Sequence, residues 1–397
     1  MRLKLKISFL MASALLTGCE TYNLERPREN LVERRQTELI NRSEVIAVVN
    51  SVDIAADLEQ KAARWGYELK RKEVLEGLDL YLLTFDCPPG IDPHVASAEL
   101  EQLQPLSTVE ANHKYVLQSA ENNSPLMASI KPRRYANSLI EWPKDGCEAL
   151  FNIGIIDGGV DTNALVVDSS VAIKSRRFMA GKQAAEARRH GTAIAEILVG
   201  NGRLKNTSLF NASVVSEDKD GIHYSGVESI LKALDWMARS DVRVVNISLA
   251  GPYNRTLDRG IQRAADKGII IVAAVGNEGA GSSPLYPAAL EDVIAATAVD
   301  SDAHIYHKAV QGQHVDVAAP GVEVFVGDAE TGRYVSGTSI ATPFVVAKIA
   351  SDPRYAAIKS VKNIRTLLSV DAIDLGAAGP DSVYGVGLIQ ANNGCSQ

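Results

Sequence analysis

The sequence predicts a doubly wound α/β domain with a mainly parallel sheet over residues 146–397, preceded by a smaller α+β domain over residues 44–118. Across 146–397, apolar strands alternate with amphipathic helices, which is typical of βαβ units in a parallel sheet. Two of these strands end in a polar residue beside glycine, at Asp157 and Asn277, where sites form in such sheets. Residues 44–118 instead combine four short strands with only two helices.

Composition limits the classes of function. The chain has 397 residues, of which 46% are apolar and 22% are charged, as is ordinary for globular domains. The net charge is −7, the sequence pI is near 5.6, and no basic face is apparent. We therefore expect no nucleic-acid partner.

The N-terminus has the pattern of an export signal. Three basic residues between Arg2 and Lys6 precede an apolar stretch over residues 7–16, which is too short to span a bilayer as a helix. Leu16-Thr-Gly-Cys19 resembles the lipobox of bacterial lipoproteins. That resemblance implies a signal peptide over 1–18 and a lipid on Cys19.

The position after the lipobox bears on localisation. Glu20 follows Cys19, so the inner-membrane retention that an aspartate implies in lipoproteins is absent, and we expect the outer membrane, facing the periplasm or the cell surface. An ordinary secretory signal with an incidental cysteine is the alternative. Residues 19–43 are charged and poor in aromatics, which favours a tether.

The small domain has a recognisable order of elements. The expected elements are a strand over 45–49, a helix over 53–65 capped by Ser51 or Asp53, strands over 67–74 and 78–85, a helix over 92–103 and a closing strand over 109–117. This is the ferredoxin-like arrangement. Residues 119–145 are polar and form a predicted linker.

The large domain continues as strands and helices in alternation. The expected strands are 151–157, 209–215, 243–249 and 269–275, and the expected helices are 227–238, 255–267 and a buried helix that includes Phe344 to Ile349.

The chemistry centres on Tyr334-Val-Ser-Gly-Thr-Ser-Ile-Ala-Thr-Pro343. Gly337 allows a close backbone approach, and Ser339 would lie on the first turn of the buried helix. Free backbone N–H groups and the helix dipole favour an oxyanion there. A serine hydroxyl is a weak nucleophile without a base, so a histidine and an acid are required elsewhere.

Both partners precede the serine. Asp157 ends an apolar strand, and Arg189-His-Gly-Thr places His190 where a polar loop enters an apolar helix. The chain order Asp, His, Ser is that of subtilisin. With these three motifs the sequence resembles the subtilisin-like serine peptidases, the subtilases, over about residues 146–391.

The resemblance implies a role for each residue. Ser339 attacks the carbonyl, His190 moves the proton, and Asp157 holds the imidazole. Asn277 and the Ser339 N–H stabilise the oxyanion. A side-chain amide is also a common turn former, which is the alternative for Asn277 alone.

A substrate-binding edge is also implied. Its residues are Ser248, Leu249, Ala250 and Gly251, whose backbone would pair with an extended peptide. Ala274 and Gly276 would line the pocket for the residue before the scissile bond. These small apolar walls favour an uncharged side chain.

Residues 44–118 resemble a subtilase propeptide, which implies a domain that assists folding and blocks the cleft until it is cleaved. An independent adaptor domain is the alternative. Cleavage is expected within the polar linker. Cys147 and Cys395 lie at the ends of the large domain, where either a disulfide or two free thiols fits the sequence.

Three positions depart from the family. Gly158 replaces the usual Ser or Thr after the acid, Ala193 replaces a frequent second histidine, and Ile340 replaces the commonest methionine. The loss of a hydroxyl beside Asp157 leaves slower catalysis open.

No metal or other cofactor is expected. Asp218-Lys-Asp-Gly221 has a calcium-like pattern but lacks the remaining ligands, so an exposed turn is favoured and structural calcium is not signalled. His304 and His307 have helical spacing, but no helix and no third ligand are evident.

The sequence thus predicts an exported, lipid-anchored serine endopeptidase that acts on proteins or peptides, is matured by cleavage of its own propeptide, and contacts a membrane through its lipid. The alternative is a non-catalytic lipoprotein that binds extended peptides. That alternative does not require Asp157, His190, Asn277 and Ser339 in register.

Overall fold

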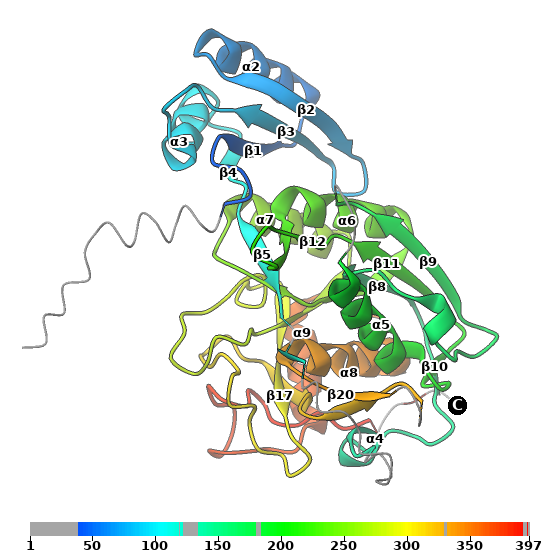
Figure 1. The fold of residues 1–397 in the computed structure, drawn as a ribbon. Helices are drawn as coiled ribbons and strands as arrows, with labels where there is room; N and C mark the ends of the chain where they lie inside the picture. The colour runs from blue at the N-terminus through cyan, green and yellow to red at the C-terminus, as the bar shows by residue number, and fades with distance from the viewer. Residues whose placement is uncertain are drawn as a thin grey trace, which may run out of the picture. The chain divides into compact units, whose positions relative to one another are not determined.

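The computed structural model describes residues 39–118, 120–121, 134–179, 184–328, 332–391 and 395, and residues 38–397 form one compact unit (Figure 1). The proposed signal peptide, Cys19 and most of the proposed tether lie outside the described residues. Among the helices that the structure describes, none is long and apolar enough to cross a membrane.

The large domain is built on a seven-stranded sheet. Its strands in spatial order are β18 (Val317–Pro320), β17 (Val293–Val299), β16 (Ile270–Ala274), β14 (Val242–Ile247), β8 (Asn152–Asp157), β11 (Ser208–Ser213) and β9 (Ala172–Arg177). Every neighbouring pair is parallel. From β8 the chain builds one side of the sheet and then the other, which confirms the predicted doubly wound fold.

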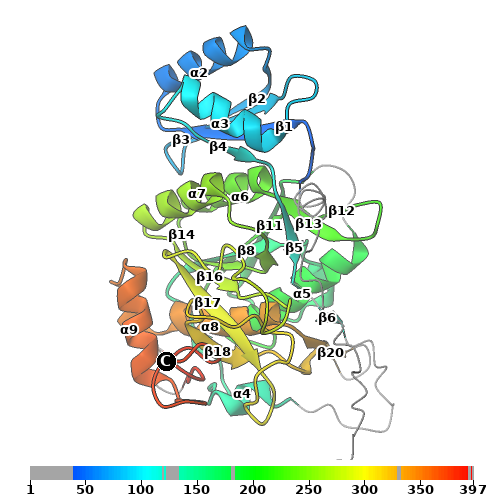
Figure 2. The same ribbon diagram turned by 90° about the vertical axis from the view of Figure 1, so that its left-hand side faces the viewer.

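Helices cover both faces of this sheet (Figures 1 and 2). One face carries α5 (Ala185–Val199) and α8 (Thr338–Ser351), and the other carries α6 (Val227–Arg239) and α7 (Arg255–Asp266). A further helix, α9 (Val361–Asp371), packs against β17. Every residue of α8 is buried, which explains why residues 344–350 are apolar apart from Lys348.

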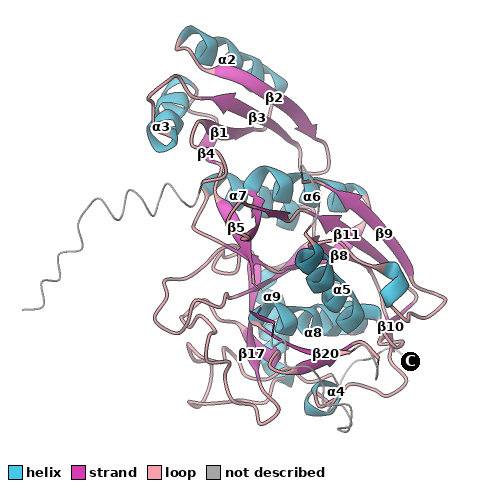
Figure 3. Cartoon of the chain, viewed as in Figure 1, coloured by secondary structure: helices cyan, strands magenta, loops and turns pink. Residues whose placement is uncertain are grey.

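Shorter elements join these layers (Figure 3). They are β6 (Ala120–Glu121), α4 (Ala136–Leu139), β7 (Cys147–Glu148), β10 (Leu204–Lys205), β12 (Ser216–Glu217), β13 (His223–Gly226), β15 (Leu249–Ala250), β19 (Val324–Val326) and β20 (Arg333–Ser336), with 3-10 turns at Thr162–Ala164 and Pro353–Tyr355.

The small domain has a four-stranded antiparallel sheet. Its order is β2 (Glu68–Leu75), β3 (Leu80–Asp86), β1 (Glu44–Val49) and β4 (Thr108–Ala111), with helices α2 (Val52–Arg64) and α3 (Pro93–Leu103). Ser51 caps α2 and Asp92 caps α3, with Pro93 in the first turn. The ferredoxin-like order expected from the sequence is present.

The two faces of this sheet have different partners. Along β1, Val45, Ala47 and Val49 pack into a core shared with α2 and α3. The alternating residues Ile46 and Val48 belong instead to the core of the large domain, where β1 and β4 contact α7. The small domain therefore buries its second face only by docking.

The prediction of a single closing strand over 109–117 is wrong. The chain bends at Asn112-His113, so β4 stays in the small sheet while β5 (Lys114–Leu117) enters the large domain. At the bend, the Asn254 amide lies 2.8 Å from His113 Nδ1 and donates to the Ala111 carbonyl at 3.0 Å. These buried contacts come from the large domain, so the local sequence could not reveal the break.

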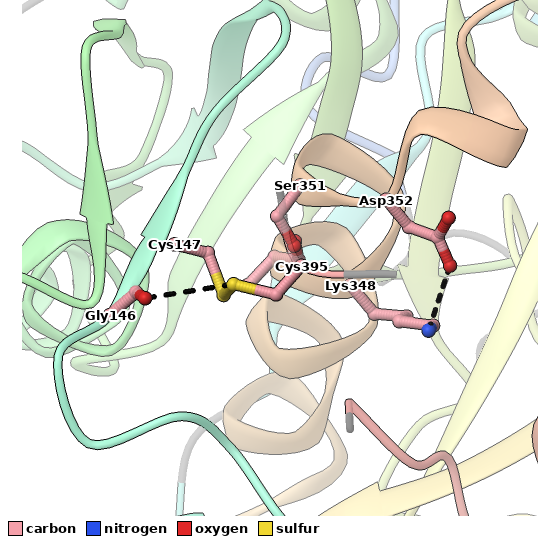
Figure 4. Close-up of a disulfide and its surroundings, with 7 residues drawn as sticks. Gly146, Cys147, Lys348, Ser351, Asp352 and Cys395 are labelled. Atoms are coloured by element: carbon pink, nitrogen blue, oxygen red, sulfur yellow. Dashed lines mark hydrogen bonds and ion pairs between the residues drawn. A yellow bond between two sulfur atoms is a disulfide. The ribbon is translucent and has the colours of Figure 1, made fainter. Parts of the chain in front are cut away.

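Cys147 and Cys395 form a disulfide, with 5.5 Å between their Cα atoms and a sequence separation of 248 (Figure 4). It joins the start of β7 to the last described residue of the chain. Cys87 is a free cysteine in the small domain and is half-buried.

Candidate active site

Three side chains from different elements meet at the carboxyl edge of the large sheet. Asp157 is the last residue of β8, His190 lies on α5, and Ser339 is the second residue of α8. Asp157 and Ser339 are fully buried, and His190 is 5% exposed. His190 Nδ1 lies 2.9 Å from Asp157 Oδ1, and its Nε2 lies 2.9 Å from Ser339 Oγ. The imidazole thus bridges an acid and a hydroxyl.

The sequence indicated that His190 lies at the start of a helix, but the structure places it further inside one. α5 begins at Ala185, so the histidine occupies its second turn. Ala185, Glu186 and Ala187 favour helix and extend it toward the N-terminus. The helix backbone therefore fixes the position of the imidazole.

The glycine after Asp157 has a packing reason. A Cβ at Gly158 would lie 1.9 Å from the Ala187 carbonyl oxygen, so a Ser or Thr cannot fit while α5 approaches this closely. The Gly158 N–H donates to Asp157 Oδ1 at 2.6 Å. The second carboxylate oxygen of Asp157 is buried without a hydrogen-bond partner. The close approach of α5 thus excludes a hydroxyl-bearing side chain at position 158.

Asn277 is held so that its amide nitrogen stays free. Its Oδ1 accepts from the Thr338 N–H at 3.1 Å and from the Thr338 hydroxyl at 3.0 Å. Its Nδ2 is buried without a partner. A Cβ at Gly337, whose φ is +150°, would lie 3.3 Å from this nitrogen and 3.2 Å from Ser339 Oγ. The missing side chain leaves room for an oxyanion between them.

The edge predicted over 248–251 contributes a strand to a four-stranded antiparallel sheet. β15 contains Leu249 and Ala250 and pairs with β5 in antiparallel register. Ser248 Oγ lies 2.9 Å from Asn246 Nδ2 and is buried. Ala274 ends β16, and the Gly276 N–H donates to the Thr338 hydroxyl at 3.2 Å.

Sequence reasoning missed two parts of the site. β13 pairs with the other side of β5, opposite β15. The sequence signal for β13 was the turn over Asp218–Gly221. This turn forms the tip of a β12–β13 hairpin, and Asp218 Oδ1 accepts two backbone N–H groups there. The second omission is Thr338, which orients Asn277 and directly precedes Ser339 in the sequence.

A metal has little support in the described part of the chain. The group close enough to share an ion is Asp300, Asp302 and His304. Asp300 Oδ1 already accepts the N–H groups of the other two residues, so this arrangement is that of a turn.

Comparison with known proteins assigns a family to this site. The family model described as the subtilase family matches residues 151–387. The chain belongs to the subtilase family. It is 31% identical to subtilisin DY of Bacillus licheniformis over 253 residues, which cover 60% of this chain and 88% of that protein. It is also 31% identical to subtilisin Savinase of Lederbergia lenta, covering 51% of this chain and 76% of that protein.

A solved structure extends the similarity of fold. Fervidolysin from Fervidobacterium pennivorans, described as a keratinolytic enzyme related to subtilisin, aligns with a TM-score of 0.69 and 17% identity. The alignment covers 89% of this chain and 60% of that one. This subtilase is thus a subtilisin-like serine peptidase, as its three motifs predicted, and its fold class is confirmed.

Proposed function

We propose that Asp157, His190 and Ser339 are the catalytic triad of this endopeptidase, and that it matures by cutting off its own prodomain. The observation that carries the proposal is the continuous path of two 2.9 Å contacts from the buried acid through the imidazole to the hydroxyl. Each residue also occupies the position that the family motif predicts.

The geometry supports a defined sequence of steps. His190 Nε2 takes the proton of Ser339 as Oγ attacks the peptide carbonyl, and Asp157 stabilises the imidazolium through Nδ1. The free Nδ2 of Asn277 and the Ser339 N–H donate to the oxyanion. The leaving amine receives the proton from His190, and water then releases the acyl group by the same route. No metal or cofactor takes part in these steps.

Labelling with a fluorophosphonate probe tests the triad. The detergent-purified full chain should label once processed, whereas Ser339→Ala should not label at all. Ser351→Ala lies on the same helix and provides the matched control, which should label as the wild type does. If the wild type fails to label even after another protease removes its prodomain, the peptide-binding lipoprotein becomes the better account.

We also propose that the precursor is exported and anchored through a lipid on Cys19, with the outer membrane favoured by Glu20. The support is the signal-like segment and the lipobox pattern. Metabolic labelling with an alkyne fatty acid should mark the wild type and Cys87→Ser but not Cys19→Ser. Labelling that persists in Cys19→Ser would overturn the anchor.

The proposed partners follow from these roles: proteins or peptides as substrates, the chain's own prodomain, and a membrane reached through the lipid. Chelation by EDTA is expected to leave probe labelling of the processed enzyme unchanged. A loss of labelling that calcium restores would instead reveal a structural ion.

A further inference from the structure

The cleft of this subtilase holds a segment of its own chain. β5 lies between β13 and β15, antiparallel to both. Its pairs include Tyr115 with Ser225 and Leu117 with Leu249. The Tyr115 side chain is fully buried, and its hydroxyl donates to the Pro252 carbonyl at 2.7 Å. β5 is therefore bound as an extended peptide in a fixed register.

The register brings one residue to the nucleophile. The Gln118 N–H donates to the Ser248 carbonyl at 3.0 Å, and the Ser339 hydroxyl donates to the Gln118 carbonyl oxygen. A Cβ at Gly337 would lie 3.1 Å from that carbonyl oxygen and 3.3 Å from Asn277 Nδ2. The Gln118 carbonyl thus lies at the edge of the proposed oxyanion site.

The chain continues on the far side of Ser339. Ala120 pairs with Ser336, and Glu121 pairs with Val335, so β6 is held against β20. Ser119, which lies outside the described residues, is the single residue between the two paired segments. Gln118 and Ala120, the described residues on either side of Ser119, are therefore both held by the enzyme.

The Gln118 side chain is buried, and both the oxygen and the nitrogen of its amide form hydrogen bonds. It is 4% exposed. Its Oε1 accepts from the Asn277 N–H at 2.8 Å, and its Nε2 donates to the Val116 carbonyl at 3.1 Å. A glutamate would place a second acceptor against the Val116 carbonyl and would bury a charge, while a leucine would leave the Asn277 N–H without a partner.

We infer that Gln118–Ser119 is the bond that this enzyme cuts in its own chain, and that its pocket for the residue before the cut selects the neutral amide of glutamine. This inference rests on the proposed peptidase function and names its first substrate. It also divides the precursor at a defined place, since Cys19 stays with the prodomain and Ser339 with the enzyme.

The reaction at this bond balances without a co-reactant other than water. Ser339 Oγ bonds to the Gln118 carbonyl carbon as its proton passes to His190. The C–N bond to Ser119 breaks, and His190 protonates the new amine. Water then replaces Oγ on the carbonyl carbon, which leaves Gln118 as a carboxylate and restores the serine hydroxyl.

Mass spectrometry of the processed full chain tests the bond directly. At the earliest times of processing, digestion with a glutamate-specific protease should give a fragment spanning 111–118 that ends in the free carboxylate of Gln118. This end lies in the cleft, so later trimming of the linker does not alter it. Ser339→Ala should give no such fragment.

A synthetic peptide of residues 111–124 tests the preference apart from folding. Processed enzyme should cut it after glutamine, and kcat/KM should fall at least tenfold for the Gln118→Glu or Gln118→Leu peptide. In the full chain, Gln118→Glu should slow processing, while Gln102→Glu, an exposed change of equal charge on α3, should not.

The outcomes separate the two proposals. Probe labelling with a first cut at another bond, or equal cleavage of the three peptides, would overturn this inference and leave the triad intact. A wild type that neither labels nor cuts would overturn both.

Discussion

The two sheets of this subtilase differ in how completely they are covered. The seven-stranded sheet has helices of its own on both faces, and the Cys147–Cys395 disulfide closes its domain. The four-stranded sheet has its own helices on one face only, and its other face packs into the core of the large domain. The large domain therefore covers its own sheet, whereas the small domain, our proposed prodomain, depends on the large domain to bury its second face.

This difference matters once the chain is cut. Before cleavage, the prodomain is held by a peptide bond as well as by contacts. After cleavage at the proposed site, only the non-covalent contacts would remain, and if the prodomain carries the proposed lipid, they would decide whether the enzyme stays at the membrane.

The largest effect on the rate of maturation is expected from breaking the docked face of the proposed prodomain. Val48 is 2% exposed and belongs to the shared core, so Val48→Asp would bury a carboxylate without a partner. We expect self-cleavage to slow about 100-fold or more, which corresponds to roughly 3 kcal/mol. The rate of appearance of the processed enzyme measures this effect.

The matched control is Val74→Asp. Val74 lies on the same sheet but is 55% exposed, so this variant should mature at the wild-type rate. Equal rates for the two variants would mean that docking of the second face is not required.

The disulfide of the large domain can be removed without changing the docked face of the small domain. Replacing both Cys147 and Cys395 by serine removes a bridge that closes a loop of 248 residues. We expect a loss of about 4 kcal/mol in the free energy of unfolding and a Tm lower by roughly 10 °C. Calorimetry of the Ser339→Ala chain checks this, with Cys87→Ser as the control. An unchanged Tm would show that the bridge adds nothing to this fold.

Low pH should weaken the binding of the cleaved prodomain to the enzyme, because His113 becomes protonated. Burial, with a smaller contribution from nearby His94, lowers the pKa of His113 to about 4. A released histidine has a pKa near 6.5, so docking is complete above about pH 6.5 and weakens as the pH falls toward 4. At pH 5.5 the prodomain should bind about tenfold more weakly than at pH 7.5.

The surroundings of His113 define the control for this pH effect. The His94 ring lies 5.6 Å away, Asn254 contacts Nδ1, and Glu110 lies 4.0 Å from His94. Release of the prodomain fragment from the cleaved, probe-inhibited complex is measured against pH. His113→Gln should flatten the profile between pH 7.5 and 5.5, and His307→Asn should not. A wild-type profile without slope would contradict the role of His113.

The smallest effect is expected at the rim of the interface. Arg255 on α7 contacts Glu101 at 2.9 Å and Glu110 at 3.0 Å in the prodomain, but its side chain is 43% exposed. Exposed ion pairs contribute little, so Arg255→Ala should speed release of the cleaved prodomain only about threefold to fivefold. The effect should shrink in high salt. Arg259→Ala, on the same helix, should leave the release rate unchanged.

Much of the fold and of the site could be predicted because the signals are local. The strand before Asp157, the buried run after Ser339 and the alternation between them depend on residues close in sequence. The chemistry needs an acid, a base and a nucleophile in a fixed order, so three short motifs were sufficient to place them at one edge of one sheet.

Other features depended on contacts between distant segments. The bend at His113 is stabilised by Asn254, the glycine at 158 is required by the close approach of α5, and the glutamine at 118 is held by Asn277. None of these pairings has a local periodicity. The sequence by itself thus determined which residues form the proposed triad, while the tertiary structure decided which carbonyl group they face, because that depends on how two separately patterned domains pack.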